Sequence, residues 1–117
     1  EKDVEFRYAP SGFAGLETAL GVVLTGLYHS GAFTLPEVIE RMTAAPARVL
    51  GLAAGTLTAG AAADIVIIDP EREWTVDSAA FYTRGKCTPF AGKKLKGRAV
   101  ATIVAGRLVM EQGKVKE

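Results

Sequence analysis

The sequence predicts a chain in which helices come first and β-strands follow. Apolar residues recur with the 3.6-residue period of a helix up to about Leu52, and with a period of two, or in short β-branched runs, after it. No internal repeat or low-complexity linker interrupts the 117 residues. This length suits one ordinary domain or part of a larger one.

The first predicted helix covers about residues 14–30. Its apolar residues follow i, i+3, i+4 spacing: Leu16, Ala19, Leu20, Val23, Leu24, Leu27 and Tyr28. Gly21 and Gly26 each lower the helix propensity by about 1 kcal/mol relative to Ala. We therefore expect both glycines to admit a closely packed neighbour.

Two shorter helices are predicted next. Thr34 and Glu37 have the spacing of a capping box, with Pro36 in the first turn, where the missing N–H costs nothing. The third helix is predicted from about Pro46 to Leu50, and Gly51 suits its C-terminal cap.

Four strands are expected in the second half. Ile65–Ile68 is a β-branched run between Asp64 and Asp69-Pro70, typical of a strand buried on both faces. Alternation around Trp74 and Val76 predicts a separate, half-exposed strand. Val100–Val104 and Leu108–Met110 predict a hairpin that turns tightly at Ala105-Gly106.

The charge is unevenly distributed along the chain. Residues 1–77 hold five Lys or Arg and eleven Asp or Glu, whereas residues 78–117 hold nine and two. The basic stretch contains Arg84, Lys86, Lys93, Lys94, Lys96 and Arg98. No nucleic-acid-binding motif accompanies it, so we expect a solvated face or one resting on the acidic half. The apolar runs are too short to span a membrane, which takes about 20 residues.

The usual parts of a catalytic centre are missing from the sequence. His29 is the only histidine and Cys87 the only cysteine, so neither belongs to a ligand cluster or a disulfide. One unpaired cysteine suits a reducing, cytoplasmic location. Asp64 and Asp69 flank a strand, where aspartates more often form turns than acid–base pairs. No catalytic or metal-binding residue is therefore predicted here.

One stretch, Ala9-Pro10-Ser11-Gly12, has the properties of a binding loop. Pro10 stiffens it, and Gly12 allows a ligand to approach the backbone. The free N–H groups of a helix beginning nearby would favour acceptor or anionic groups. A plain turn leading into the helix explains the same residues, so both interpretations stay open at this point.

Several motifs together resemble those of dihydroorotases. APSGFAGLETAL is similar to their A-P-F-G-x-x-G-L-E-T-A-L, and TAAPARVLGL to N-P-A-R-[IV]-L-G-L. GTLTAGAAADIVIIDPEREWTV resembles a segment shared by many amidohydrolases, and KCTPFAGKKLKGRAVATIVAGRLV resembles N-T-P-F-x-G-x-x-L-x-G-x-V-x-A-T-[IV]-V-x-G-[KR]-x-V. The first and last motifs favour dihydroorotase over hydantoinase, although allantoinase shares some of both.

The resemblance implies an α/β parent protein, a metal-dependent (β/α)8 barrel with a small β-sandwich domain. Residues 1–51 would be the last loop and helices of the barrel, and residues 52–117 the C-terminal part of the sandwich. Glu1-Lys2 is similar to the end of an E-E-K segment that follows the catalytic strand. The ligands of two zinc ions would then lie upstream, in the N-terminal barrel portion, which would be this chain's first partner. We therefore expect the 117 residues alone to bind no zinc tightly and to be inactive.

The implied reaction is the reversible cyclisation of N-carbamoyl-L-aspartate to L-dihydroorotate in pyrimidine biosynthesis. Ser11 and Gly12 match the family's substrate-contacting pair, through their main chain. Ala45 replaces a family Asn, and a lost helix cap there should cost about 1 kcal/mol. A homodimer and a complex with aspartate transcarbamoylase are partners that the resemblance allows, whereas nucleic acid and membranes are not expected. The alternatives are another cyclic amidohydrolase, such as an allantoinase or hydantoinase, and a non-catalytic dihydroorotase-like scaffold of aspartate transcarbamoylase.

Overall fold

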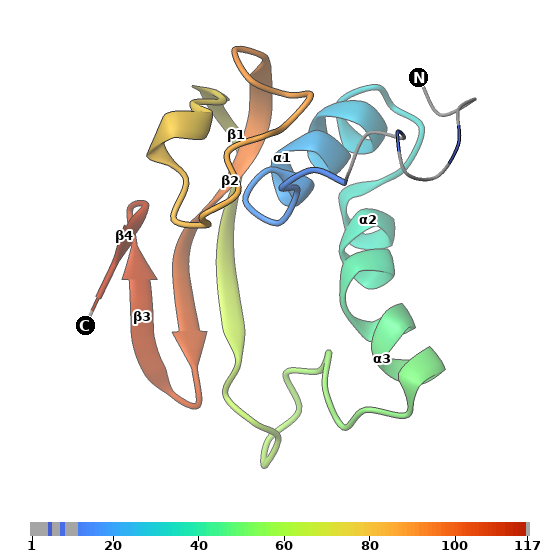
Figure 1. Cartoon of the computed structure of the whole chain (residues 1–117). Helices are drawn as coiled ribbons and strands as arrows, with labels where there is room; N and C mark the ends of the chain where they lie inside the picture. Colours follow the sequence, from blue (N-terminus) through green and yellow to red (C-terminus); the bar gives the residue numbers. More distant parts are fainter. Residues whose placement is uncertain (1–4, 6–7, 9–11, 117) are drawn as a thin grey trace.

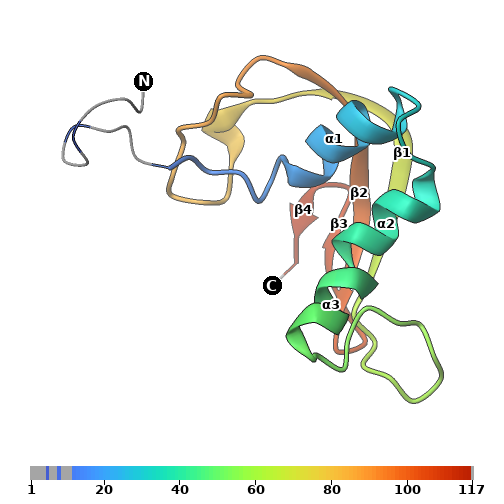
Figure 2. The ribbon, with the colours of Figure 1, turned by 90° about the vertical axis from the view of Figure 1, so that its right-hand side faces the viewer.

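The structure is a computed structural model that describes residues 5, 8 and 12–116. The helical half comes first and the strands follow, as predicted. Figure 1 shows the helices beside the sheet, and in Figure 2, seen from the helical side, they lie in front of the strands. The long loop of residues 52–64 joins the two layers at one end of the molecule.

The first helical segment begins later than predicted. It consists of a short α-helix, α1 (Ala19–Val23), followed by a turn of π-helix, η2 (Leu24–Tyr28). The predicted start near residue 14 is wrong, since α1 begins at Ala19. Before the helix, the Ala14 amide donates to the Cys87 carbonyl oxygen (2.8 Å), 73 residues away, and the Ala19 amide donates to the Gly15 carbonyl (2.8 Å). No periodicity in the sequence reveals a contact as distant as that of Ala14.

The two glycines of this segment behave differently. A Cβ at Gly21 would lie 2.9 Å from Cζ2 of Trp74, so this glycine admits a close neighbour, as expected. At Gly26 a Cβ would meet nothing within 4 Å, so the same expectation is wrong there. The neighbouring Thr25 makes the contact with the sheet instead. Its Oγ1 donates to the Lys96 carbonyl (3.2 Å) and accepts from the Lys96 amide (2.8 Å).

The next two helices are α2 (Leu35–Met42) and α3 (Ala44–Leu50). The predicted capping box of α2 forms, and Gly51 ends α3 in the left-handed conformation (φ 64°). Helix α3 starts two residues earlier than predicted, with Thr43 at its N-cap position. Ala45 thus lies inside the helix, so the expected loss of a helix cap at this residue is wrong.

The sheet begins with one long strand in place of two short ones. Strand β1 (Ile65–Thr75) runs through Asp69-Pro70 and pairs antiparallel with β2 (Lys94–Val104). A register shift between Asp69 and Glu73 accommodates Pro70, which cannot donate to the ladder. Val66 and Ile67 are 50% and 51% exposed, so the prediction of a strand buried on both faces is wrong.

The rest of the sheet is a meander in the order β1-β2-β3-β4. The predicted hairpin joins β2 to β3 (Arg107–Glu111) through Ala105 (φ 47°) and Gly106 (φ 77°), and β4 (Lys114–Val115) follows. Between β1 and β2 lies a loop that contains a 3-10 turn, η3 (Ser78–Ala80). Among the described residues the sheet is open, with β1 and β4 as its edges.

The core is small for a chain of this length. One cluster consists of Val76, Phe81 and Leu95, against which Trp74 and Phe90 pack. Leu24 and Val38 are fully buried, and Leu24 packs against Gly97 of β2. Many large apolar side chains on the helices, the loop of residues 52–64 and β1 remain exposed. None of the helices in the described part of the chain has the length and apolar character needed to cross a membrane.

Candidate functional site

The predicted substrate-binding pair is only partly described. Ser11 lies outside the described residues, while Gly12 is exposed and belongs to no helix or strand. A Cβ at Gly12 would meet no atom of the described residues within 4 Å, and its φ is not in the left-handed region. In the described part of the chain, the space beside the Gly12 backbone is therefore open. The expected contribution from a helix N-terminus is wrong, because α1 starts only at Ala19 and is five residues long.

The segment that follows Gly12 is fixed against the loop of residues 81–90. Besides the bond from the Ala14 amide to Cys87, the ring of Phe13 packs edge-on against Phe90, with 6.0 Å between the ring centroids. The exposed Gly12 therefore leads directly into an anchored backbone.

Glu17 makes the strongest polar contact between these two segments. Its two carboxylate oxygens accept the backbone amides of Tyr82 (3.1 Å) and Thr83 (3.0 Å). Partial desolvation raises the pKa of Glu17, but the amides of Thr83 and Tyr82, the Thr83 side chain and the charge of Lys86 outweigh it and lower the pKa below its usual value. The carboxylate is thus stabilised in its ionised form. Sequence reasoning missed Glu17, although it is the one acid within the predicted helix of residues 14–30.

The aspartates that flank the first strand stabilise turns, as predicted. Oδ1 of Asp64 accepts the Ala105 amide at the β2–β3 turn (2.7 Å), and Oδ1 of Asp69 accepts the Glu71 amide (3.0 Å). Each carboxylate thus accepts a backbone amide at a separate turn.

His29 and Cys87 have separate surroundings. Nε2 of His29 lies 2.8 Å from the Pro70 carbonyl oxygen, which can only accept, so Nε2 carries the hydrogen. The Cys87 thiol is exposed. Within residues 5, 8 and 12–116, no group of three or more His, Cys, Asp or Glu side chains is arranged to hold a metal ion.

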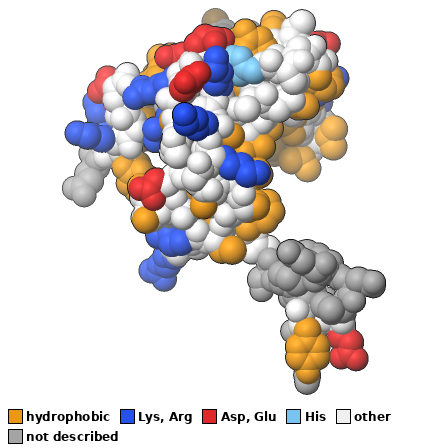
Figure 3. Space-filling view, turned by 90° about the horizontal axis from the view of Figure 1, so that it is seen from above, with side chains coloured by type: hydrophobic (Ala, Val, Ile, Leu, Met, Phe, Trp, Pro, Cys, Tyr) orange, Lys and Arg blue, Asp and Glu red, His pale blue; other side chains and the backbone are white. Residues whose placement is uncertain are grey.

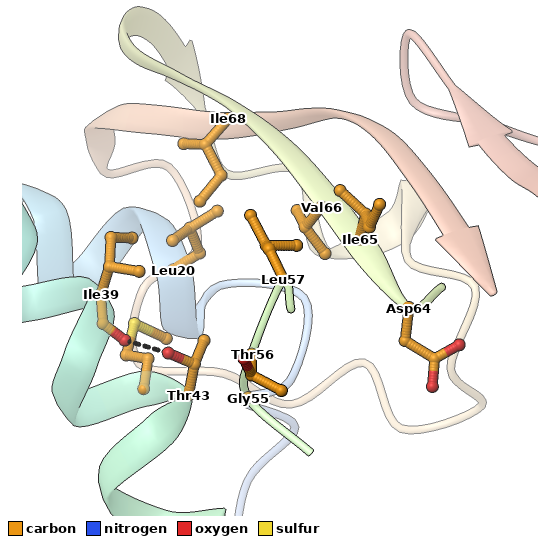
Figure 4. Close-up of a pocket in the computed structure, with 11 residues that line it drawn as sticks. Leu20, Ile39, Thr43, Gly55, Thr56, Leu57, Asp64, Ile65, Val66 and Ile68 are labelled. Atoms are coloured by element: carbon orange, nitrogen blue, oxygen red, sulfur yellow. Dashed lines mark hydrogen bonds between the residues drawn. The ribbon is translucent and has the colours of Figure 1, made fainter. Parts of the chain in front are cut away.

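An apolar groove of about 500 Å³ lies between the helices and β1. Figure 4 shows Leu20 and Ile39 from the helical side facing Val66 and Ile68 of β1, with Leu57 of the loop of residues 52–64 between them. Thr43 at its rim donates to the Ile39 carbonyl (2.7 Å), so the helical wall has no free hydroxyl there. The groove is lined mainly by apolar side chains, and the polar groups of Asp64 and Thr56 at its lining are bonded to Ala105 and Thr58.

Two members of the basic stretch, Lys96 and Arg98, contact side chains of β1. Lys96 pairs with Glu73 (3.5 Å) and lies 3.9 Å from Glu71, so part of the stretch rests on the acidic half, as expected. The Arg98 guanidinium covers the Trp74 ring at 4.9 Å. On the face presented in Figure 3, Lys and Arg side chains are interspersed with Asp and Glu.

The arrangement of helices, long loop and meander agrees with a known family. The model of the amidohydrolase family matches residues 12–110. The chain belongs to the amidohydrolase family. This amidohydrolase chain is 53% identical over 114 residues to the dihydroorotase of Anaeromyxobacter dehalogenans strain 2CP-C, and 53% identical over 111 residues to that of Pelotomaculum thermopropionicum. The predicted resemblance to dihydroorotases is therefore confirmed.

These matches cover 97% and 95% of the amidohydrolase chain but only 26% of each relative. The chain thus spans about a quarter of the length of the curated relatives it matches. Among solved structures, the L-hydantoinase (dihydropyrimidinase) from Arthrobacter aurescens superimposes with a TM-score of 0.86 at 36% identity, covering 93% of this chain and 25% of that one.

Proposed function

We propose that this chain is the C-terminal part of a dihydroorotase, which reversibly cyclises N-carbamoyl-L-aspartate to L-dihydroorotate in de novo pyrimidine biosynthesis. The observation that carries the proposal is the 53% identity to a dihydroorotase over 97% of the chain. The sequence identity to the similar L-hydantoinase structure is lower, at 36%. The parent would be a cytoplasmic (β/α)8-barrel enzyme with a small β-sandwich, and residues 1–51 and 52–117 would belong to these two parts.

The parent enzyme would use two zinc ions held by other segments of the longer protein. The described residues of this chain do not fit a zinc centre, because they provide no ligand cluster and the one histidine, His29, donates to a backbone carbonyl. We therefore assign no catalytic step to this chain. Its proposed contribution is to bind substrate.

Substrate contact is assigned to the main chain of Ser11 and Gly12. The ring of dihydroorotate carries amide donors and acceptors, which a rigid backbone edge can read without a charged side chain. The open space beside Gly12 and the anchored residues that follow it support this role.

The experiment is steady-state kinetics on variants of the longer protein that contains this chain. Gly12→Val should lower kcat/KM for dihydroorotate by about tenfold, or about 1.4 kcal/mol, because the new side chain fills the ligand space. Ser11→Ala should stay within a few-fold of the parent, since the proposed contact uses its backbone. Gly26→Val is the matched control, because Gly26 also has open space around it but lies on the helical segment. Unchanged kinetics in Gly12→Val would refute the substrate contact.

A hydantoinase is the second candidate, favoured by the TM-score of 0.86 to an L-hydantoinase. Parallel assays with dihydroorotate and with hydantoin substrates separate the two. Turnover of hydantoins with none of dihydroorotate would replace the dihydroorotase proposal. The isolated 117-residue chain should turn over neither substrate and should take up no stoichiometric zinc in elemental analysis.

A further inference from the structure

The contacts between the segment of residues 12–18 and the loop of residues 81–90 all follow directly after Gly12. They are the main-chain bond from Ala14 to Cys87, the Phe13–Phe90 ring contact and the two amide bonds to Glu17. Four contacts within five residues restrict the backbone far more than one surface contact would. The position of the open Gly12 backbone is therefore set by the loop of residues 81–90.

Glu17 is itself held in place. The next residue, Thr18, is fully buried, and its Oγ1 donates to the Gly15 carbonyl (3.1 Å). The Glu17 carboxylate accepts two parallel N–H bonds from consecutive residues, and such charge-assisted bonds are about twice as strong as neutral ones. The two donors fix where the carboxylate lies, and the buried Thr18 fixes the backbone behind it.

The loop of residues 81–90 is in turn tied to the sheet. Phe81 is buried in the cluster with Val76 and Leu95. The Tyr82 hydroxyl donates to the Gly113 carbonyl (3.2 Å) and accepts the Val115 amide (3.3 Å). A rigid path therefore runs from the sheet through the loop to Glu17 and on to Gly12.

We propose that Glu17 is a positioning residue of the substrate site, which acts by fixing the Gly12 segment against the loop of residues 81–90. The proposal rests on the proposed function, in which the Gly12 main chain faces dihydroorotate. Glu17 touches no substrate in this scheme. Glu17 restricts the backbone of the Gly12 segment before substrate binds. The backbone then loses less conformational entropy on binding, and preorganisation of this kind strengthens binding.

The test compares Glu17→Gln with Glu40→Gln in the longer protein. Glutamine has the shape of glutamate but turns one acceptor into a donor, which would then face a backbone N–H of residues 82–83. Glu40 is an exposed acid on α2, paired with Arg48 and away from Gly12, so it controls for the loss of one charge. Two readouts are taken: amide hydrogen exchange of residues 14, 82 and 83, whose N–H groups are bonded across the contact, and kcat and KM for dihydroorotate.

Glu17→Gln is expected to speed exchange at these amides at least tenfold and to raise KM several-fold, while kcat changes less than twofold. Glu40→Gln is expected to change neither readout. Phe13→Leu, at a side chain that is 56% exposed, removes the ring contact by a second route and should give the same pattern if Glu17→Gln fails to fold.

The outcomes separate this proposal from the proposed function. Unchanged amide exchange in Glu17→Gln would show that Glu17 does not fix the Gly12 segment against the loop of residues 81–90. Faster exchange with unchanged KM overturns the positioning role while Gly12→Val still impairs kcat/KM. If Gly12→Val also has parental kinetics, the substrate contact at Gly12 fails and the positioning role fails with it.

Discussion

Gly97 lies where the first helical segment crosses the sheet. Its φ is +92°, and a Cβ there would lie 2.3 Å from Cδ1 and 3.0 Å from Cβ of Leu24, which is fully buried. The Gly97 carbonyl accepts Nε1–H of Trp74 (3.1 Å). One residue without a side chain thus lets a helix and an indole approach the same point of β2.

Gly97→Ala is expected to destabilise the chain by at least about 2 kcal/mol. Overpacking against Leu24 costs roughly 1–3 kcal/mol, and the left-handed conformation costs a non-glycine residue about 1–2 kcal/mol more. Urea unfolding of the 117-residue chain measures the change. Gly26→Ala is the control, since its new methyl group meets nothing and alanine favours a helix. Equal stability of the two variants would contradict the close packing at Gly97.

The sequence predicts that some of these residues are closely packed, but it does not identify the distant residues that they contact. A tightly packed glycine was predicted correctly at Gly21 and wrongly at Gly26, because both sit in the same apolar pattern and only Gly21 faces Trp74. Glu17 was missed for a related reason. Its amide partners lie 65 and 66 residues further along the chain.

At the scale of elements, the parts that depend on local chemistry were predictable. The capping box of α2, the left-handed Gly51 and the β2–β3 turn each follow from residues within about four positions of one another. The continuity of β1 was not predictable, since it depends on pairing with residues 94–98, and the start of α1 was placed about five residues too early. In the sequence, Asp69-Pro70 indicates the end of a strand, because proline cannot donate to a strand ladder. The strand continues past Pro70 because residues on both sides of it pair with β2.

The capping box of α2 predicts a stability that depends on pH. Oε2 of Glu37 accepts the Thr34 amide (2.8 Å) and the Thr34 hydroxyl (2.7 Å). These bonds from the Thr34 amide and side chain, helped by Arg41 and opposed by slight desolvation, lower the pKa of Glu37 below its ordinary value of 4.5. Because the folded-state pKa is depressed, the stabilisation is fully present above pH 4.5 and is lost as the pH falls through the folded value.

Urea unfolding of the parent chain and Glu37→Gln at pH 7 and pH 3 should reveal this dependence. The parent should be the more stable at pH 7, and the difference should shrink toward zero at pH 3. Thr34→Ala, which removes the hydroxyl partner, should lower stability at pH 7 in the same direction. An equal difference between parent and Glu37→Gln at both pH values would show that the carboxylate does not stabilise this helix through its charge.

At the scale of the whole molecule, the chain has too few buried side chains for its apolar composition. Hydrophobic residues make up 49% of it, yet Val66, Ile67 and Leu57 are at least half exposed. The sequence predicted apolar strands correctly, but it could not show which faces the chain's own helices would cover. In the proposed dihydroorotase, other segments of the longer protein would cover the groove and the β1 edge.

The isolated 117-residue chain is therefore expected to self-associate through the groove. Exposed apolar surface stabilises association by about 25 cal/mol per Å² buried, and the groove leaves such surface uncovered. Val66→Lys places a charge in the groove and should weaken association at least tenfold, or about 1.4 kcal/mol. Val115→Lys on β4 is the matched control, because Val115 is similarly exposed (56%) but lies outside the groove. Sedimentation velocity over a range of concentrations measures both variants. A parent chain that stays monomeric throughout, or equal weakening by both substitutions, would mean that the groove is not the surface through which copies meet.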